Sequence, residues 1–274
     1  MQLRIALNDK QEIPALGLGV WQTPNNAAVE VVKFALQAGY RHVDTAAIYG
    51  NEEGVGDGLR ASGIARGEVF VTTKVWNEEQ GYDKALRAVA ASLARLKLDA
   101  VDLCLIHWPS PQRGLYLETW RALIRAKEDG LVRSIGVSNF EVEHLDRIIG
   151  ETGVVPVLNQ VELHPRFQQA RLRAAHEERG IRTEAWSPLG QGKLLADPAI
   201  ARIAAKHGRT AAQVILRWHL DNGLVAIPKS VTPSRIQENF EVAGFALDAG
   251  DMQAIAALDD PRGRIGPDPM KASF

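Results

Sequence analysis

The feature that most constrains the fold is the alternation of strand-like and helix-like segments along the whole chain. Short apolar runs alternate with longer segments whose apolar residues recur at helical spacing. The strand-like segments are residues 17–21, 40–44, 69–74, 101–107, 131–138, 154–160, 181–187 and 224–229. The helix-like segments include residues 25–38, 83–96, 119–129, 141–150, 168–179, 210–220 and 233–240. Eight such strand–helix units predict an α/β fold, a closed (β/α)8 TIM barrel rather than an open sheet.

Three further segments lie outside the barrel count. Residues 4–16, with Asn8-Asp9 in the middle, predict an N-terminal β-hairpin, and residues 197–207 and 248–258 predict two extra helices. Residues 261–269 are typical of a loop. The 274 residues suit one barrel, which often reaches ~250 residues, and no Pro-, Gly- or Ser-rich linker interrupts them. We therefore expect residues 1–274 to form a single domain.

Charge and composition exclude several classes of partner. The formal net charge is −1, so neither nucleic acid nor an anionic membrane is an expected partner. No apolar run approaches the ~18 residues that span a bilayer, and the N-terminal residues lack a signal-peptide pattern. Cys104 is the only cysteine, so no internal disulfide can form. These features predict a soluble cytoplasmic protein.

Four chemically capable side chains follow three of the predicted strands. Asp44, Lys74 and His107 lie at strand ends, and Tyr49 lies in the loop after Asp44. These four residues are called the tetrad below. In (β/α)8 barrels the C-terminal ends of the strands and the following loops build the active site. Strand alternation points Lys74 and His107 toward the barrel axis, where a charged lysine needs a carboxylate such as Asp44.

Each member of the tetrad, taken singly, has a simple structural explanation. Asp44 could cap a helix, Lys74 could be a solvated strand end, His107 a hydrogen-bonded core residue and Tyr49 a packing residue. All four nevertheless fall at strand exits in chain order. This joint placement favours a shared functional role.

The sequence resembles the aldo-keto reductase family over its whole length, and within it the prokaryotic 2,5-diketo-D-gluconate reductases. The resemblance is carried by the run Asp-Thr-Ala-Ala-Ile-Tyr-Gly-Asn-Glu-Glu-Gly-Val-Gly at 44–56 and by Pro-Leu-Gly-Gln-Gly-Lys at 188–193. It implies an oxidoreductase that reduces aldehydes and ketones to alcohols with NADPH. The substrates that it suggests are keto-sugar acids and methylglyoxal-type aldehydes.

The resemblance also assigns a role to each member of the tetrad. Tyr49 donates a proton to the carbonyl oxygen, although a free tyrosine, with a pKa of ~10, is a weak donor. Lys74 would make the phenol more acidic, and Asp44 would keep that lysine charged and oriented. His107 would hydrogen-bond the carbonyl oxygen and set its approach to the cofactor. The chemistry of the residue types is consistent with these roles.

Cofactor binding cannot rest on a Rossmann fingerprint. The glycines at 54, 56 and 58 lack the G-x-G-x-x-G spacing and lie inside a predicted helix, where they indicate close helix packing. NADPH would instead bind across the barrel mouth. The resemblance implies the following positions: Ser138, Asn139 and Gln160 for the nicotinamide carboxamide; Trp186 for stacking; Ser187, Leu189 and Gln191 for the pyrophosphate; Lys229, Ser230, Thr232 and Arg235 for the 2′-phosphate; Glu238 and Asn239 for adenine.

Aromatic residues after three strands predict the substrate pocket. Trp21, Trp76 and Trp108 would form an apolar wall beside His107, although Trp21 stands where the family would have Phe. The histidines show no metal-binding spacing, so no metal is expected. Cys104 has the opposite strand parity to His107, which predicts packing under helices rather than reactivity.

Two rival functions come from other classes. A Schiff-base lyase could use Lys74 as its nucleophile, but it would leave Lys229 and Arg235 without a role. A non-enzymatic, NADPH-binding regulatory barrel would need a partner-binding segment, and the sequence shows none. The expected partner is therefore a small carbonyl compound, and the expected oligomeric state is a monomer.

Overall fold

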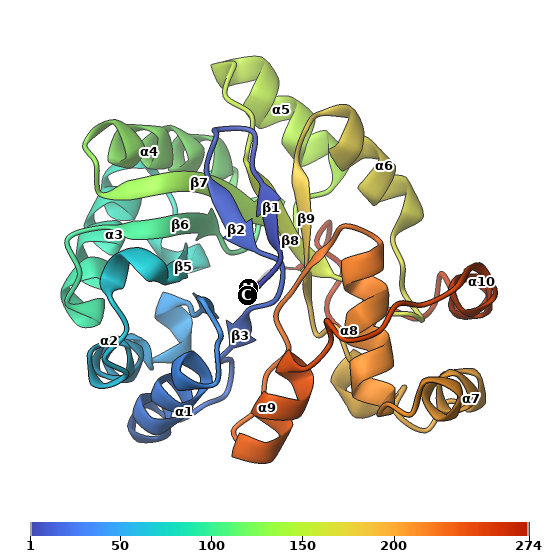
Figure 1. Ribbon diagram of the computed structural model, residues 1–274. Helices are drawn as coiled ribbons and strands as arrows, with labels where there is room; N and C mark the ends of the chain where they lie inside the picture. Colours follow the sequence, from blue (N-terminus) through green and yellow to red (C-terminus); the bar gives the residue numbers. More distant parts are fainter. Residues whose placement is uncertain (1, 273) are drawn as a thin grey trace.

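The computed structural model describes residues 2–272 and 274, and it forms the predicted barrel (Figure 1). Eight parallel strands pair in the order β3-β4-β5-β6-β7-β8-β9-β10. The edge strands are joined by hydrogen bonds from Gly17 N to Ala226 O (2.9 Å) and from Gly19 N to Pro228 O (3.1 Å), which close the sheet. The strands are β3 (Leu18–Gly19), β4 (His42–Asp44), β5 (Phe70–Val75), β6 (Val101–Ile106), β7 (Val132–Ser138), β8 (Leu158–Glu162), β9 (Arg182–Trp186) and β10 (Val225–Ala226).

Helices surround this sheet on its outer side. Eight of them follow the strands: α1 (Asn25–Gln37), α2 (Glu52–Ala61), α3 (Tyr82–Leu96), α4 (Tyr116–Glu128), α5 (Val142–Thr152), α6 (Ala170–Glu178), α8 (Ala211–Asp221) and α9 (Pro233–Phe240). The two predicted extra helices are α7 (Pro198–His207) and α10 (Ala249–Ala256). Each extra helix begins where an aspartate side chain, Asp197 or Asp248, accepts a backbone N–H of the first turn.

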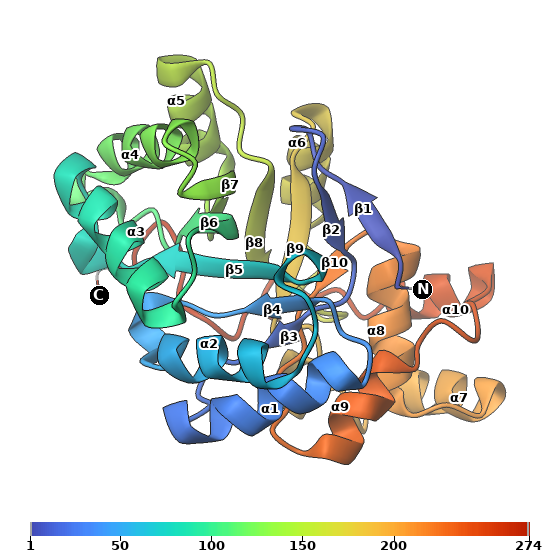
Figure 2. The same cartoon turned by 60° about the vertical axis from the view of Figure 1, so that its left-hand side comes forward.

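The N-terminal hairpin closes one end of the barrel. Strands β1 (Arg4–Ala6) and β2 (Glu12–Pro14) pair antiparallel, as predicted. Leu7 and Ile13 pack against inward-facing Phe70, Leu103 and Leu105, so apolar side chains fill this end of the barrel. The two ends of the chain lie on opposite sides of the molecule, and the C-terminus lies on the side toward which β5 points (Figure 2). The tail of the chain therefore borders the other end of the barrel, where the strands finish.

Several strands are shorter than the sequence patterns predict, and proline limits two of them. The segment expected to begin at Val154 pairs only from Leu158, because Pro156 cannot donate a ladder hydrogen bond and restricts the residue before it. β10 is limited to Val225–Ala226, and after Pro228 the pairing resumes only as an isolated bridge between Lys229 and Gly19. Proline rather than hydrophobicity thus sets these boundaries.

The glycines of α2 reflect close helix packing, as the sequence analysis inferred. A Cβ atom on Gly54 would collide with the carbonyl oxygen of Asn25, at the start of α1. A Cβ atom on Gly56 would collide with the carbonyl oxygen of Leu96, at the end of α3. Only glycine lets α2 approach both neighbours this closely. The run is a packing feature and not a phosphate-binding loop.

Strand parity sorts the core into an inner and an outer layer. Leu103 and Leu105 point into the barrel, whereas Cys104 and Ile106 pack with the surrounding helices. Burial raises the pKa of the Cys104 thiol to about 12, which disfavours the reactive thiolate. No helix in the described part of the chain is both long and apolar enough to cross a membrane.

Candidate active site

A buried ion pair forms the floor of a pocket at the C-terminal ends of the strands. Lys74 Nζ donates to Asp44 Oδ1 at 2.6 Å and to the backbone oxygen of Thr45 at 3.0 Å. Asp44 is 2% exposed and Lys74 1%. Burial disfavours the Lys74 cation, but the charge and hydrogen bond of Asp44, together with Tyr49 and Glu184, outweigh burial and raise the pKa of Lys74. A lysine held charged in this way is a poor Schiff-base nucleophile, which argues against the lyase alternative.

Tyr49 lies above this pair on the short helix η1 (Ala47–Tyr49), which follows β4 directly. Lys74 Nζ is 5.1 Å from the centre of the Tyr49 ring, and the His107 ring meets that ring edge-on at 5.7 Å between centroids. Burial raises the pKa of Tyr49, and the charge of Lys74 offsets only part of the rise. Lys74 thus lowers the pKa of this phenol, as expected, although burial leaves that pKa above the ordinary tyrosine value. The phenol is therefore protonated at rest, which is the state that a proton donor requires.

His107 follows β6 and lines the same pocket. Its backbone N–H donates to Val75 O at 3.1 Å, which continues the pairing of β6 with β5. Burial and the nearby charge of Lys74 lower the pKa of His107 well below its usual value. The imidazole is therefore neutral, and it can donate one hydrogen bond to a substrate oxygen without adding a second cation.

The pocket has a volume of about 490 Å³ and brings together most of the predicted site residues. Those that line it are Trp21, Asp44, Tyr49, Trp76, His107, Trp108, Ser138, Asn139, Gln160, Trp186, Ser187, Gln191 and Lys229. Lys74 lies buried beneath them. The remaining predicted cofactor residues lie outside this lining: Leu189, Ser230, Thr232, Arg235, Glu238 and Asn239.

Residues 261–269 are a loop, as predicted, and the tail that follows them forms one wall of the pocket through Phe274, whose packing was not predicted. The Phe274 ring lies parallel to Trp76 at 5.8 Å between centroids and edge-on to Trp108 at 5.1 Å. Asn77 Nδ2 donates to the backbone oxygen of Phe274 at 2.9 Å. The sequence signal for this packing was an aromatic residue in an otherwise irregular tail. The apolar wall is thus built from two strand exits and the tail.

A buried carboxylate holds the tail in place. Glu162, at the end of β8, accepts the backbone N–H groups of Ile265 at 2.6 Å and Gly266 at 2.7 Å. His164 Nε2 lies 3.0 Å from Glu162 Oε1, the oxygen that also accepts from Ile265. A Cβ atom on Gly266 would come within 2.6 Å of the Trp186 ring, so only glycine fits there. The tail is therefore held against Trp186.

The predicted carboxamide-binding residues form a connected chain that fixes the Trp186 ring. Asn139 Oδ1 accepts from Trp186 Nε1 at 2.8 Å, and Asn139 Nδ2 donates to His107 O and Ser138 Oγ at 3.0 and 3.1 Å. Ser138 Oγ in turn donates to the backbone oxygen of Gln160 at 2.7 Å. Sequence reasoning did not anticipate this supporting role of Asn139. One face of Trp186 is thereby presented to the pocket.

Four residues of the pocket lining have backbone conformations that are unusual for residues other than glycine. Gln22, Asn139, Ser187 and Gln191 have φ angles of 56°, 62°, 48° and 54°. Such left-handed conformations cost of order 1 kcal/mol each and cluster at functional sites. Three of the four, Asn139, Ser187 and Gln191, follow β7 and β9, which supports a binding function for this side of the pocket.

The outer end of the pocket is suited to an anion. Lys229 and Arg235 are exposed, and neither forms an ion pair within residues 2–272 and 274. Helix α9 starts at Pro233, and its capping residue Thr232 makes no side-chain cap to the first-turn N–H groups. Unpaired N–H groups and two free cations at a helix start fit a phosphate group such as the 2′-phosphate of NADPH.

The other predicted cofactor residues are partly engaged within the protein. The Ser230 hydroxyl accepts the backbone N–H of Thr232 at 3.1 Å, and the Glu238 carboxylate accepts a threonine hydroxyl at 2.8 Å. Leu189 packs against the apolar core, and Asn239 is buried. Their cofactor roles remain predictions.

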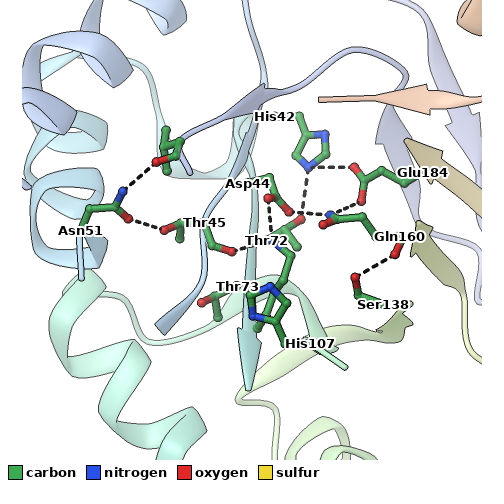
Figure 3. A network of polar contacts seen from close by, with 12 residues as sticks. His42, Asp44, Thr45, Asn51, Thr72, Thr73, His107, Ser138, Gln160 and Glu184 are labelled. Carbon is green, nitrogen blue, oxygen red and sulfur yellow. Dashed lines mark hydrogen bonds and ion pairs between the residues drawn. The ribbon is translucent and has the colours of Figure 1, made fainter. Parts of the chain in front are cut away.

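A buried polar chain beneath the tetrad also escaped the sequence analysis (Figure 3). Gln160 Nε2 donates to both Asp44 Oδ2 and Glu184 Oε2, each at 2.8 Å. His42 Nε2 lies 3.1 Å from Thr72 Oγ1 and 3.8 Å from Glu184 Oε1. A carboxylate in the middle of a predicted strand was the available signal for Glu184.

Comparisons with known proteins found similar sequences and structures. The aldo/keto reductase family model matches residues 15–260. An aldo-keto reductase of a Mycobacterium species is 54% identical over 98% of both chains, and the methylglyoxal reductase DkgA of Escherichia coli is 50% identical over 97% of this chain and 96% of that one. A crystal structure of a Gox0644 variant in complex with NADPH has a TM-score of 0.97 and 56% identity, with both chains fully covered.

Proposed function

Because the chain belongs to the aldo/keto reductase family, and so is an NADPH-dependent oxidoreductase that reduces carbonyl groups, we propose that the tetrad is its catalytic centre. The observation that carries the proposal is the convergence of the Lys74–Asp44 pair, Tyr49 and His107 on one pocket at the strand ends. A protonated phenol, a permanent cation and a neutral imidazole are the groups that proton transfer to a carbonyl oxygen requires.

Each side chain then has a defined task. NADPH, when bound, supplies the hydride that reduces the carbonyl carbon. Tyr49 donates its proton to the carbonyl oxygen, and the Lys74 ammonium stabilises the phenolate that remains. Asp44 keeps Lys74 charged and in place through its 2.6 Å contact. His107 donates a hydrogen bond that orients the carbonyl oxygen toward Tyr49.

We further propose that the cofactor lies between Trp186 and the start of α9. The fixed Trp186 ring, the strained rim and the free cations at α9 support this assignment. The residues proposed to hold it are Ser138, Asn139 and Gln160 at the carboxamide, Trp186 beneath the nicotinamide, Ser187, Leu189 and Gln191 along the pyrophosphate, Lys229, Ser230, Thr232 and Arg235 at the 2′-phosphate, and Glu238 and Asn239 at adenine.

For the substrate we propose small uncharged carbonyl compounds, such as methylglyoxal and aromatic aldehydes, in preference to keto-sugar acids. The reacting end of the pocket is walled by Trp76, Trp108 and Phe274. Lys229, at the cofactor end, is the one cation among the described residues that line the pocket. A keto acid would therefore have no exposed cation to pair with its carboxylate near the tetrad.

A substrate panel followed by loss of NADPH absorbance tests this function. We expect kcat/KM for methylglyoxal and an aromatic aldehyde to exceed that for 2,5-diketo-D-gluconate by about tenfold or more, the effect of one unpaired charged group. A preference for the keto-sugar acid would refute the substrate proposal. Failure to reduce any carbonyl compound would refute the assignment of the tetrad as well.

We also propose that the protein acts as a monomeric, single-domain cytoplasmic enzyme. The N-terminal hairpin and the tail both pack against the same eight-stranded barrel. Its one cysteine, Cys104, is buried and unpaired. Sedimentation of the purified protein would test the oligomeric state.

Arg235→Ala should weaken NADPH binding about tenfold and leave NADH binding nearly unchanged. The exposed guanidinium should contribute one charge-assisted hydrogen bond to the 2′-phosphate, worth ~1.5 kcal/mol after allowance for solvent screening. Fluorescence titration at low and high salt is the measurement, and the difference should shrink at high salt. Arg87→Ala, on the exposed face of α3, is the matched control. Equal losses for NADPH and NADH would show that Arg235 acts through packing.

A further inference from the structure

Glu184 is a buried carboxyl that the mechanism above does not use. It lies on β9, directly across from Gln160 in the register of β8 with β9, and it is fully buried. It enters the barrel interior beside Asp44 and His42 (Figure 3). A buried acid without a cation of its own is costly, so its position calls for an explanation.

The Gln160 amide is held by two carboxyl groups at once. Its Nε2 donates one hydrogen to Asp44 Oδ2 and the other to Glu184 Oε2, both at 2.8 Å. An amide nitrogen has only two hydrogens, so both are used. The amide oxygen must therefore face away from the two acids. Because Gln160 lines the pocket, this oxygen is available there as an acceptor.

Rotation of the amide is opposed mainly by Asp44. An inverted Gln160 would place its carbonyl oxygen against the Asp44 carboxylate and would lose that hydrogen bond inside the barrel. In the observed orientation, Glu184 Oε2 accepts the second amide hydrogen. Asp44 thus sets the direction of the amide, and Glu184 supplies the second contact that holds it in place.

The surroundings of Glu184 also determine its charge. Burial, followed by the charge of Asp44, raises the pKa of Glu184 to about 8, and burial lowers the pKa of His42 to about 3. Near neutral pH, Glu184 is therefore protonated and uncharged. The negative charge of Asp44 then balances the positive charge of Lys74. The titratable groups that face it are His42 and Asp44 on β4, Lys74 on β5 and Tyr49 on η1; β10 contributes only Val225 and Ala226.

We propose that Glu184 is a positioning residue, which in its uncharged state fixes the Gln160 amide and, through it, the nicotinamide of bound NADPH. This inference rests on the proposed role of Gln160 at the carboxamide. The Gln160 oxygen accepts a carboxamide hydrogen, and its fixed direction holds the reactive end of the cofactor. When Glu184 loses its proton, the added negative charge raises the pKa of Tyr49 and makes it a poorer acid.

Two variants separate positioning from charge. Glu184→Gln retains an oxygen that accepts from Gln160, whereas Glu184→Leu removes the acceptor but fills similar space. The probes are NADPH and adenosine 2′,5′-bisphosphate, which lacks the nicotinamide. We expect Glu184→Leu to weaken NADPH binding about tenfold and to leave adenosine 2′,5′-bisphosphate binding unchanged, as for one lost hydrogen bond. Glu184→Gln should bind both nucleotides like the wild type.

The pH profile provides a second arm that does not need the leucine variant. In the wild type, carbonyl reduction should fall as pH rises through about 8, because Glu184 then ionises. In Glu184→Gln this fall should be absent. Persistence of the fall in Glu184→Gln would overturn the inference.

The binding arm can contradict the inference in two ways. Wild-type NADPH affinity in Glu184→Leu would show that Gln160 needs no second restraint, and equal losses for both nucleotides would show a merely structural role. Nucleotide binding is measured without a carbonyl substrate. Failure of the proposed function would appear instead in the wild type, as a lack of turnover or of NADPH binding.

Discussion

Tyr49→Phe is expected to lower the rate of carbonyl reduction by about 10³-fold or more while NADPH still binds, within the range that a general acid contributes. The reason is that Tyr49 carries the hydroxyl among the tetrad side chains, over the Lys74 ammonium and against the neutral His107 ring. Phenylalanine keeps the ring and its packing and removes only the hydroxyl group that carries the proton.

Turnover and fluorescence titration separate the two effects in this variant. NADPH affinity should stay within about twofold of the wild type, because no hydrogen bond to the cofactor is lost. Tyr116→Phe is the matched control, since Tyr116 is buried among Phe140 and His144 away from the pocket. Near-normal turnover in Tyr49→Phe would assign the proton to another group.

Lys74→Met should affect both activity and stability. Methionine fills the same space but leaves Asp44 in the barrel without its cation, with Glu184 close behind it. Breaking a buried ion pair in this way destabilises a protein by about 3–5 kcal/mol. Loss of the charge that stabilises the Tyr49 phenolate should lower the reduction rate by about 10²-fold or more.

A second substitution distinguishes these effects. Asp44→Asn in the Lys74→Met background removes the unpaired charge, so urea unfolding should show most of the lost stability restored. Reduction should remain slow, because no cation then faces Tyr49. If activity returned together with stability, Lys74 would have only a structural role.

The strand–helix alternation was sufficient to predict the barrel. Short apolar runs marked the strands, and segments with helical spacing of apolar residues separated them. The parity of Lys74 and His107 placed both at the mouth, and the buried lysine required Asp44 as its partner. These inferences depend on local periodicity and on elementary electrostatics, which the sequence contains directly.

Other parts depend on contacts between segments that are far apart in the sequence. The hydrogen bond from Gly266 N to Glu162 joins segments about 100 residues apart, and the packing of Phe274 on Trp76 joins segments about 200 residues apart. No local sequence pattern predicts either contact. The net effect on Tyr49 also needed the structure, because burial outweighs the opposing charge of Lys74. The balance between these two effects depends on depth, which a sequence does not specify.

The most direct test of the central claim is a single turnover with NADPH deuterated at the C4 position that reacts. We expect methylglyoxal to be converted in ordinary water to an alcohol that carries one deuterium on the former carbonyl carbon, at a rate that Tyr49→Phe lowers by about 10³-fold. Such a product would show direct hydride transfer at a pocket whose proton comes from Tyr49. An alcohol without deuterium, or an equal rate in the Tyr49→Phe variant, would contradict the role assigned to the tetrad.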